Sequence, residues 1–140
     1  MIEPPNLEAL FLLETQCNPV PWSKSQLEKE IENKDSILLG TFSDSKLIAY
    51  LIFRLGFNEA EVLQIGVDLN FRKKGIAKNL LKEGIKRLPK SIEVLNLEVR
   101  KSNSQAILFY NKIDFKQVGE RKGYYQESNE DAVLMSKILL

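Results

Sequence analysis

The sequence has no histidine and a single cysteine, Cys17, among its 140 residues. Without histidine, the side chain that most often carries protons near neutral pH is missing. One cysteine excludes an internal disulfide and any zinc site built from several cysteines. Acid–base chemistry must therefore use glutamate, aspartate, tyrosine, lysine or water, and we expect no metal site.

Long apolar runs and a strong charge of one sign are also lacking. No stretch of about 18 apolar residues occurs, so no transmembrane helix is predicted. The segment Met1–Pro5 has neither the basic nor the apolar part of a signal peptide, which predicts a cytoplasmic protein. The formal net charge of +1 argues against a protein that binds nucleic acid through its bulk charge. A chain of this length is expected to form a single domain, residues 1–140.

Apolar periodicity predicts a mixed α/β fold in which a strand, a helix and a second strand form a parallel crossover. A Ser102-x-x-Gln105 capping box is expected to open the last helix. Gly66 interrupts a predicted strand, which suggests a bulge or a close approach to the backbone. The helices are expected at Asn6–Thr15, from Ser23 onward, at Gly75–Leu88 and at Ser104–Lys112, and the strands at Ile37–Phe42, Leu47–Leu55, Glu59–Val67, Ile92–Val99, Phe115–Gly123 and Ala132–Ile138.

A basic loop stands at the expected start of the third helix. Arg72, Lys73 and Lys74 precede Gly75 there. Helix N-termini favour acidic residues by about 0.3–1 kcal/mol each, so these cations do not serve helix stability. A phosphate-bearing ligand would explain them, because a helix N-terminus after a glycine is an anion site. A solvated loop is the alternative.

Lysines continue along the same helix at intervals of four residues and form a basic ridge. A ridge of this kind is typical of a solvated helix face, and contact with nucleic acid is the alternative interpretation. Its members are Lys74, Lys78, Lys82 and Lys86.

Three polar residues follow the second strand of the crossover. Glu98 lies near the end of that strand, and Asn103 and Tyr110 lie on the turn and helix after it. Ligands of open α/β sheets bind beyond the carboxyl ends of parallel strands, so these residues and the basic loop are expected to converge. Two structural alternatives stand beside this one. In the first, Glu98 pairs with Arg100, and in the second, helical spacing places the Tyr110 ring in the core with only its hydroxyl available.

The motif Arg72-x-x-Gly75-x-Ala77 after Gln64–Asp68, together with the string Leu97–Asn103, resembles the GNAT superfamily of acyl-CoA-dependent N-acetyltransferases. Pro21-Trp22-Ser23 and Tyr124-Tyr125 extend the likeness to the RimI-type enzymes, which acetylate the N-terminal alanine of a small-subunit ribosomal protein. The resemblance implies a mostly antiparallel sheet with a central parallel crossover flanked by helices. It also implies acetyl-CoA as the donor, a protein or peptide N-terminus as the partner, and no membrane.

The resemblance further implies a role for each residue of the motifs. Glu98 would be the general base, and Tyr110 the acid that protonates the departing thiolate. Asn103 would hydrogen-bond the cofactor arm. The remaining cofactor contacts would come from the backbone of Ile65, Gly66 and Val67 for the pantetheine arm, and from the segment Arg72, Lys73, Lys74, Gly75, Ile76, Ala77 and Lys78 for the pyrophosphate.

Two further functions stay open. The acceptor could be a lysine side chain, a polyamine or another small amine with the same donor. A non-catalytic module that binds acyl-CoA, or contacts RNA through the lysine ridge, belongs to a different class.

Overall fold

The computed structural model describes residues 1–140 and contains two compact units. The first unit consists of Met1–Leu55 and Leu63–Pro89, and the second of Gly56–Val62 and Lys90–Leu140. That the whole chain acts as one domain stays a prediction. None of the helices combines the length and apolar character needed to cross a membrane.

The elements follow one another along the chain as β1 (Ile2–Glu3), α1 (Leu7–Cys17), α2 (Lys24–Glu32), β2 (Ser36–Ser43), β3 (Lys46–Leu55), β4 (Glu59–Val67), a 3₁₀ turn η1 (Leu69–Phe71), α3 (Ile76–Lys86), β5 (Val94–Arg100), α4 (Ser104–Lys112), β6 (Lys116–Tyr125) and β7 (Glu130–Ile138).

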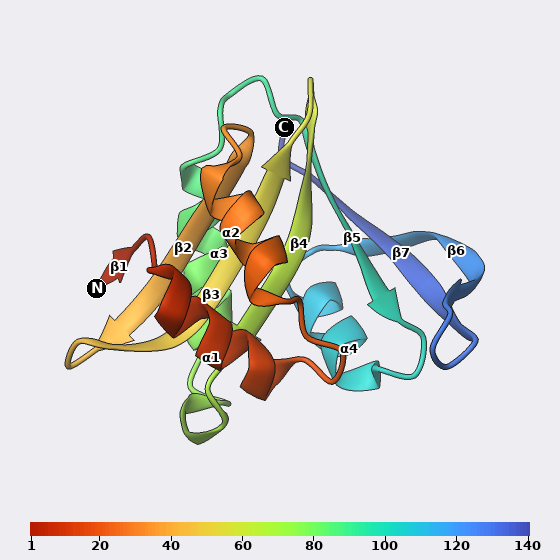
Figure 1. Cartoon of the computed structure of the whole chain (residues 1–140). Helices are drawn as coiled ribbons and strands as arrows, with labels where there is room; N and C mark the ends of the chain where they lie inside the picture. Colours follow the sequence, from red (N-terminus) through yellow and green to blue (C-terminus); the bar gives the residue numbers. More distant parts are fainter. The chain divides into compact units, whose positions relative to one another are not determined.

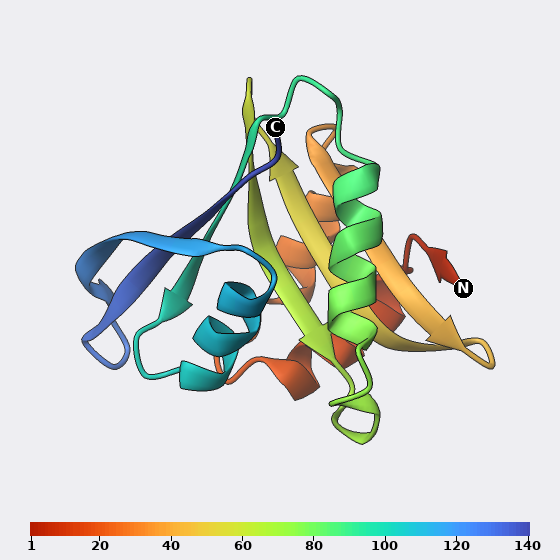
Figure 2. The same cartoon turned by 180° about the vertical axis from the view of Figure 1, so that it is seen from behind.

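The first unit is a sheet covered by helices on both faces. Its strands follow the order β1-β2-β3-β4, and β2 and β3 form an antiparallel hairpin. Helices α1 and α2 lie in front of the strands in Figure 1, and α3 lies in front of them in the opposite view of Figure 2. Strand β3 is therefore buried on both sides, which explains its nearly continuous apolar sequence.

Alternate side chains of β3 serve the two helical layers. Tyr50 and Ile52 join a core cluster with residues of α1 and α2. Leu51 and Phe53 face α3, where Gly84 lets the helix come close: a Cβ added at Gly84 would lie 2.6 Å from Leu51 Cδ2 and 3.0 Å from Phe53 Cε2. The alternation of side chains along a strand thus ties both helical layers to one strand.

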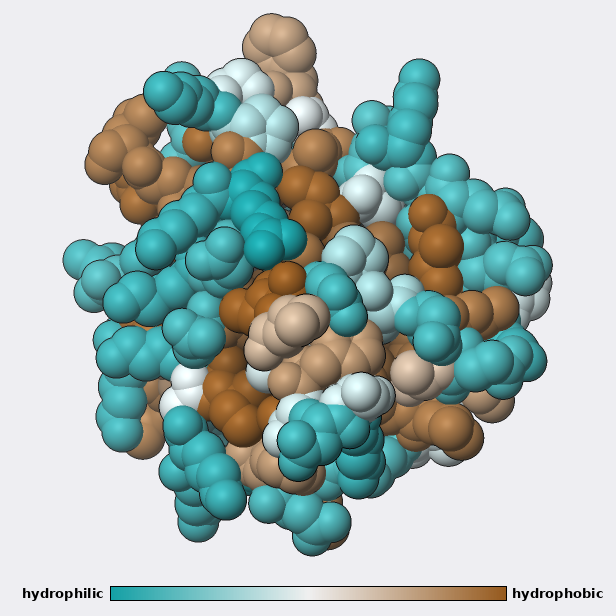
Figure 3. Space-filling view, turned by 90° about the vertical axis from the view of Figure 1, so that its left-hand side faces the viewer, coloured by the Kyte–Doolittle hydropathy of each residue, from teal (hydrophilic) through white to brown (hydrophobic).

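The outer edge of this sheet is protected by a very short strand. Ile2 and Glu3 of β1 pair with Thr41 and Gly40 of β2. Figure 3, seen from the β1 and β2 side, shows hydrophobic patches broken up by hydrophilic side chains. A two-residue strand followed by Pro4 and Pro5 offers little backbone for another chain to pair with.

The second unit contains the parallel pair. Its strand order is β4-β5-β7-β6, and β4 runs parallel to β5 from the Glu59–Val94 pair to the Val62–Leu97 pair. Strands β5 and β6 both pair with β7 in antiparallel fashion. The predicted mixed, mostly antiparallel sheet with one parallel crossover is confirmed.

One prediction about a helix start is wrong. Helix α4 is capped by Asn103, whose Oδ1 accepts the Ala106 N–H at 3.1 Å, whereas the Ser102 N–H donates to Glu130 at 2.7 Å. The expected Ser102 capping box is absent because the chain turns one residue later. Helix α3 begins at Ile76 with Gly75 as its N-cap, one residue after the expected start, and the three cations precede it as expected.

Candidate functional site

In the first unit, the loop between β4 and α3 forms the candidate phosphate cradle. Gly75 is the N-cap of α3 and has φ of +78°, a left-handed conformation that favours glycine. The first turn holds Ile76, Ala77 and Lys78 and receives no side-chain cap, whereas α1, α2 and α4 are each capped by a side chain. The amides of this turn are therefore open to an anionic ligand.

The three cations of this loop, Arg72, Lys73 and Lys74, differ in what they contact. Lys73 also has a positive φ, +62°. The Arg72 side chain folds back, and its Nε donates to the Val67 carbonyl at 3.0 Å. Lys74 Nζ lies 5.8 Å from the centre of the Phe71 ring. Arg72 is thus partly engaged in holding the loop to the end of β4, and Lys73 and Lys74 add further positive charge to the loop.

Asp68 anchors the start of this loop and was not singled out from the sequence. Its side chain is buried, accepts the Asn70 N–H at 2.9 Å and lies 3.4 Å from Lys46 Nζ. The Asn70 N–H and the Lys46 ammonium lower the pKa of this carboxyl below its usual range. The loop therefore leaves β4 in a defined direction.

The three residues predicted to meet the pantetheine arm, Ile65, Gly66 and Val67, form the end of β4. The Val67 carbonyl also accepts from Cys17 Sγ at 3.4 Å. Burial raises the pKa of the Cys17 thiol, which is half-buried. The close approach predicted at Gly66 is real, and the neighbour is the ring of Tyr50.

In the second unit, Glu98 lies on β5 with its side chain 17% exposed. It does not pair with Arg100, which contradicts the structural alternative considered above. Instead, Arg121 Nε of β6 lies 3.3 Å from Glu98 Oε1, and the Tyr124 hydroxyl hydrogen-bonds the same carboxyl group. This hydrogen bond raises the pKa of Tyr124.

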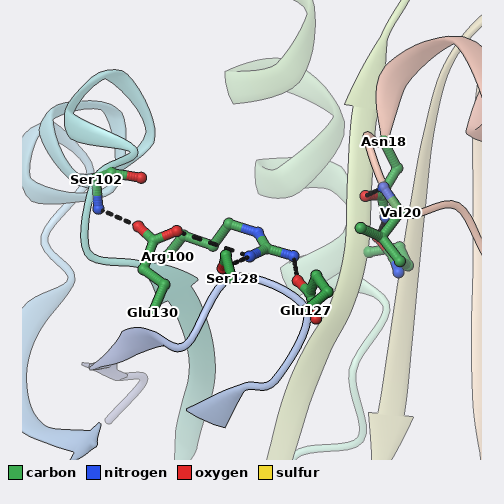
Figure 4. A network of polar contacts seen from close by, with 8 residues as sticks. Asn18, Val20, Arg100, Ser102, Glu127, Ser128 and Glu130 are labelled. Carbon is green, nitrogen blue, oxygen red and sulfur yellow. Dashed lines mark hydrogen bonds and ion pairs between the residues drawn. The ribbon is translucent and has the colours of Figure 1, made fainter. Parts of the chain in front are cut away.

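Arg100 has its own partners, on the turn between β6 and β7 and at the start of β7. Figure 4 shows its guanidinium directed at Glu127, Ser128 and Glu130. It also stacks 4.0 Å from the centre of the Tyr125 ring. Burial raises the pKa of Tyr125 to about 12. These contacts of Arg100 hold the turn in place. Arg100 is therefore engaged elsewhere, and Glu98 interacts with Arg121 and Tyr124 instead.

Tyr110 and Asn103 lie on α4 and at its start. Tyr110 is 6% exposed, and its ring makes edge contacts with Phe109 and Phe115. Burial raises the pKa of Tyr110, so its phenol keeps its proton well into the alkaline range. Asn103 uses its amide oxygen to cap α4, which leaves its amide nitrogen as the donor for a ligand.

Sequence reasoning missed Arg121 and Tyr124 as partners of Glu98, and Glu14 and Tyr50 in the first unit. One signal was present for Glu14, a lone carboxyl group on the apolar face of α1. Arg121 shows no such signal, because it is one of several cations on β6 and only the pairing of strands brings it to Glu98.

Comparison with known proteins agrees with the motifs. A family model described as the acetyltransferase (GNAT) family matches residues 7–115. The chain is 37% identical over 134 residues to the [ribosomal protein bS18]-alanine N-acetyltransferase of Haemophilus ducreyi, covering 93% of this chain and 92% of that protein. It is 34% identical over 121 residues to N-alpha-acetyltransferase RimI of Mycobacterium tuberculosis, covering 84% and 75% of the two chains. The crystal structure of the ribosomal-protein-S18-alanine N-acetyltransferase from Escherichia coli superimposes with a TM-score of 0.91 at 27% identity, covering 99% of this chain and 93% of that one.

Proposed function

Since the chain belongs to the GNAT family of acetyltransferases, and is therefore an acetyl-CoA-dependent acyltransferase, we propose that its acceptor is the N-terminal α-amine of a protein. The acceptor best supported is the N-terminal alanine of ribosomal protein bS18. The observation that carries this proposal is the match over nearly the full length of relatives named for that reaction.

Most contacts of the donor are assigned to the first unit, and Asn103 of the second unit is proposed to hydrogen-bond the cofactor arm. The uncapped amides of Ile76, Ala77 and Lys78, the left-handed Gly75 and the neighbouring lysines fit the charge of a pyrophosphate. Arg72 helps to hold the loop, and the backbone of Ile65–Val67 and the Asn103 amide would hold the pantetheine arm. Acetyl-CoA supplies the thioester that carries the acetyl group.

Proton movements are assigned to the second unit. An α-amine with a pKa of about 7.7–8.0 is mostly an ammonium at neutral pH and must lose a proton before it attacks a thioester. In our proposal Glu98 accepts that proton, directly or through water, and Tyr110 donates one to the departing sulfur. Transfer is direct, so Cys17 needs no nucleophilic role.

The role of Glu98 is tested by Glu98→Gln. The amide cannot accept the proton, so we expect kcat at pH 7 to fall about 10²–10⁴-fold while acetyl-CoA binding measured by calorimetry stays unchanged. Glu83→Gln, at an exposed ion pair on α3, is the matched control and should keep full activity. Undiminished turnover by Glu98→Gln would remove Glu98 from the role of base.

The acceptor is tested with three synthetic peptides of one sequence. The first has a free N-terminal alanine, the second is blocked at its N-terminus and keeps an internal lysine, and the third begins with serine. We expect acetylation of the first, none of the second, and slower acetylation of the third, with mass spectrometry locating the group. Acetylation of the blocked peptide on lysine would favour the lysine, polyamine or small-amine alternative.

The non-catalytic alternative is set aside, because the chain belongs to a family of acetyltransferases and matches relatives named for that activity.

A further inference from the structure

Glu14 is a fully buried carboxyl group that the proposed chemistry does not use. It is 0% exposed on α1 and accepts three hydrogen bonds. The donors are the Tyr50 hydroxyl, the Trp22 N–H at 2.8 Å and Asn18 Nδ2 at 3.1 Å. A buried carboxyl group is costly unless such donors satisfy it, so its position is closely defined.

Two connections lead from Glu14 to strand β4. The Asn18 amide also contacts Gln64 Oε1, at 3.3 Å. The Tyr50 ring, held by its hydroxyl on Glu14, lies against Gly66. Gln64 and Gly66 are two residues apart and therefore face the same side of the strand. Glu14 thus supports β4 at the residues that flank Ile65.

The contact at Gly66 leaves no room for a side chain. A Cβ at this position would lie 2.6 Å from Tyr50 Cε1 and 2.9 Å from both Cζ and the hydroxyl oxygen. Tyr50 is 1% exposed, so its ring has no open space into which to move. Burial and the neighbouring Glu14 raise the pKa of Tyr50, which keeps its hydroxyl protonated as the donor to Glu14.

We propose that Tyr50 and Glu14 are positioning residues for acetyl-CoA: the Tyr50 ring is a spacer that sets the position of β4 at Gly66, and Glu14 holds the ring in place. This inference rests on the proposed role of Ile65–Val67 in holding the pantetheine arm. The same Glu14 holds the Trp22 backbone, so the connection between α1 and α2 is fixed by the group that supports the donor strand.

The test is size compensation between Gly66 and Tyr50, read out as the Kd of acetyl-CoA by calorimetry. Gly66→Ala forces the strand and the ring apart, and we expect the Kd to rise about ten-fold. Tyr50→Leu removes the spacer and should also weaken binding. In the double variant the added methyl group refills part of the space, so its Kd should be lower than that of Gly66→Ala alone.

If the Tyr50 ring does not set the position of β4 for acetyl-CoA, the two changes act on the Kd independently and their effects multiply. A double variant that binds as weakly as the product of the single effects would therefore overturn the proposal. Gly119→Ala on β6 is the control, since its Cβ would meet only Leu134 at an ordinary 3.4 Å, and its Kd should match that of the wild type.

Two further comparisons keep the test decisive. If Tyr50→Leu does not fold, Gly66→Ala combined with Tyr50→Phe replaces the double variant. The ring clash remains there, so no recovery is expected, and recovery would contradict the spacer role. If wild-type protein fails to bind acetyl-CoA, the donor site of the proposed function is wrong. If it binds and Gly66→Ala binds equally well, only the present inference fails.

Discussion

Tyr110 combines a buried ring with a hydroxyl proposed to act as an acid. Burial raises its pKa, so the phenol keeps its proton at pH values where an exposed tyrosine, with a pKa near 10, begins to ionise. The edge contacts with Phe109 and Phe115 hold the ring without using the hydroxyl. The ring of Tyr110 therefore packs in the core, and in our proposal its hydroxyl takes part in the reaction.

Replacing Tyr110 by phenylalanine separates these two roles. The ring contacts remain, so we expect an unchanged melting temperature and an unchanged KM for acetyl-CoA. The kcat should fall about 10²-fold, because no acid protonates the departing sulfur. In the wild type, kcat should show no loss from tyrosine ionisation up to pH 10, since the pKa is raised. Full kcat in Tyr110→Phe would exclude the acid role.

Helix α3 differs from the other helices at its N-terminus, where Gly75 replaces a capping side chain and the cations precede the first turn. Only Lys78 of the ridge belongs to that turn. Lys82 and Lys86 lie one and two turns further along. The field of a helix N-terminus acts within its first turn, so the ridge divides into a part beside the proposed phosphates and a part distant from them.

This division predicts different effects along one ridge. Lys78→Ala should raise the KM for acetyl-CoA about five-fold, equivalent to about 1 kcal/mol for one exposed phosphate contact. With acetyl-pantetheine, which lacks the pyrophosphate, the same variant should behave like the wild type. Lys86→Ala is the control and should change neither KM. Equal effects of Lys78→Ala on both donors would contradict the proposal that the first turn of α3 binds the pyrophosphate.

At the scale of the whole molecule, the absence of histidine leaves the neutral range without a titrating imidazole, and the buried tyrosines dominate the alkaline range. Burial raises the pKa of Tyr50 and of Tyr110. Above pH 10 the unfolded chain loses phenol protons that the folded chain keeps. Stability therefore falls as pH rises above the tyrosine pKa of the unfolded chain.

The contribution of these two tyrosines to the free energy of unfolding should accordingly be independent of pH below pH 9 and decline above pH 10. The slope is up to about 1.4 kcal/mol per pH unit for each of the two buried tyrosines. Urea denaturation at pH 8, 9, 10 and 10.5 measures this slope. Tyr110→Phe should reduce the slope by the contribution of one tyrosine. A slope identical in wild type and variant would contradict the raised pKa of Tyr110.

The fold was predicted well where apolar patterns are strong and local. The strand Glu59–Val67 and the helix Ser104–Lys112 were placed at the bounds that the structure shows. The errors lie at helix starts, because one residue decides which side chain reaches the free N–H groups. Asn103 instead of Ser102 caps α4, and α3 starts at Ile76, one residue after the expected Gly75.

The sequence by itself determined the family, the donor and the residues of the motifs, because a glycine loop, a strand-end glutamate and their spacing are local in the chain. Only the tertiary structure decided what surrounds them. Pairing of distant strands brings Arg121 and Tyr124 to Glu98. Packing of α1 on β3 places Glu14 on Tyr50, and Tyr50 against Gly66. These contacts join residues up to 36 positions apart, and no local pattern specifies which of them will meet.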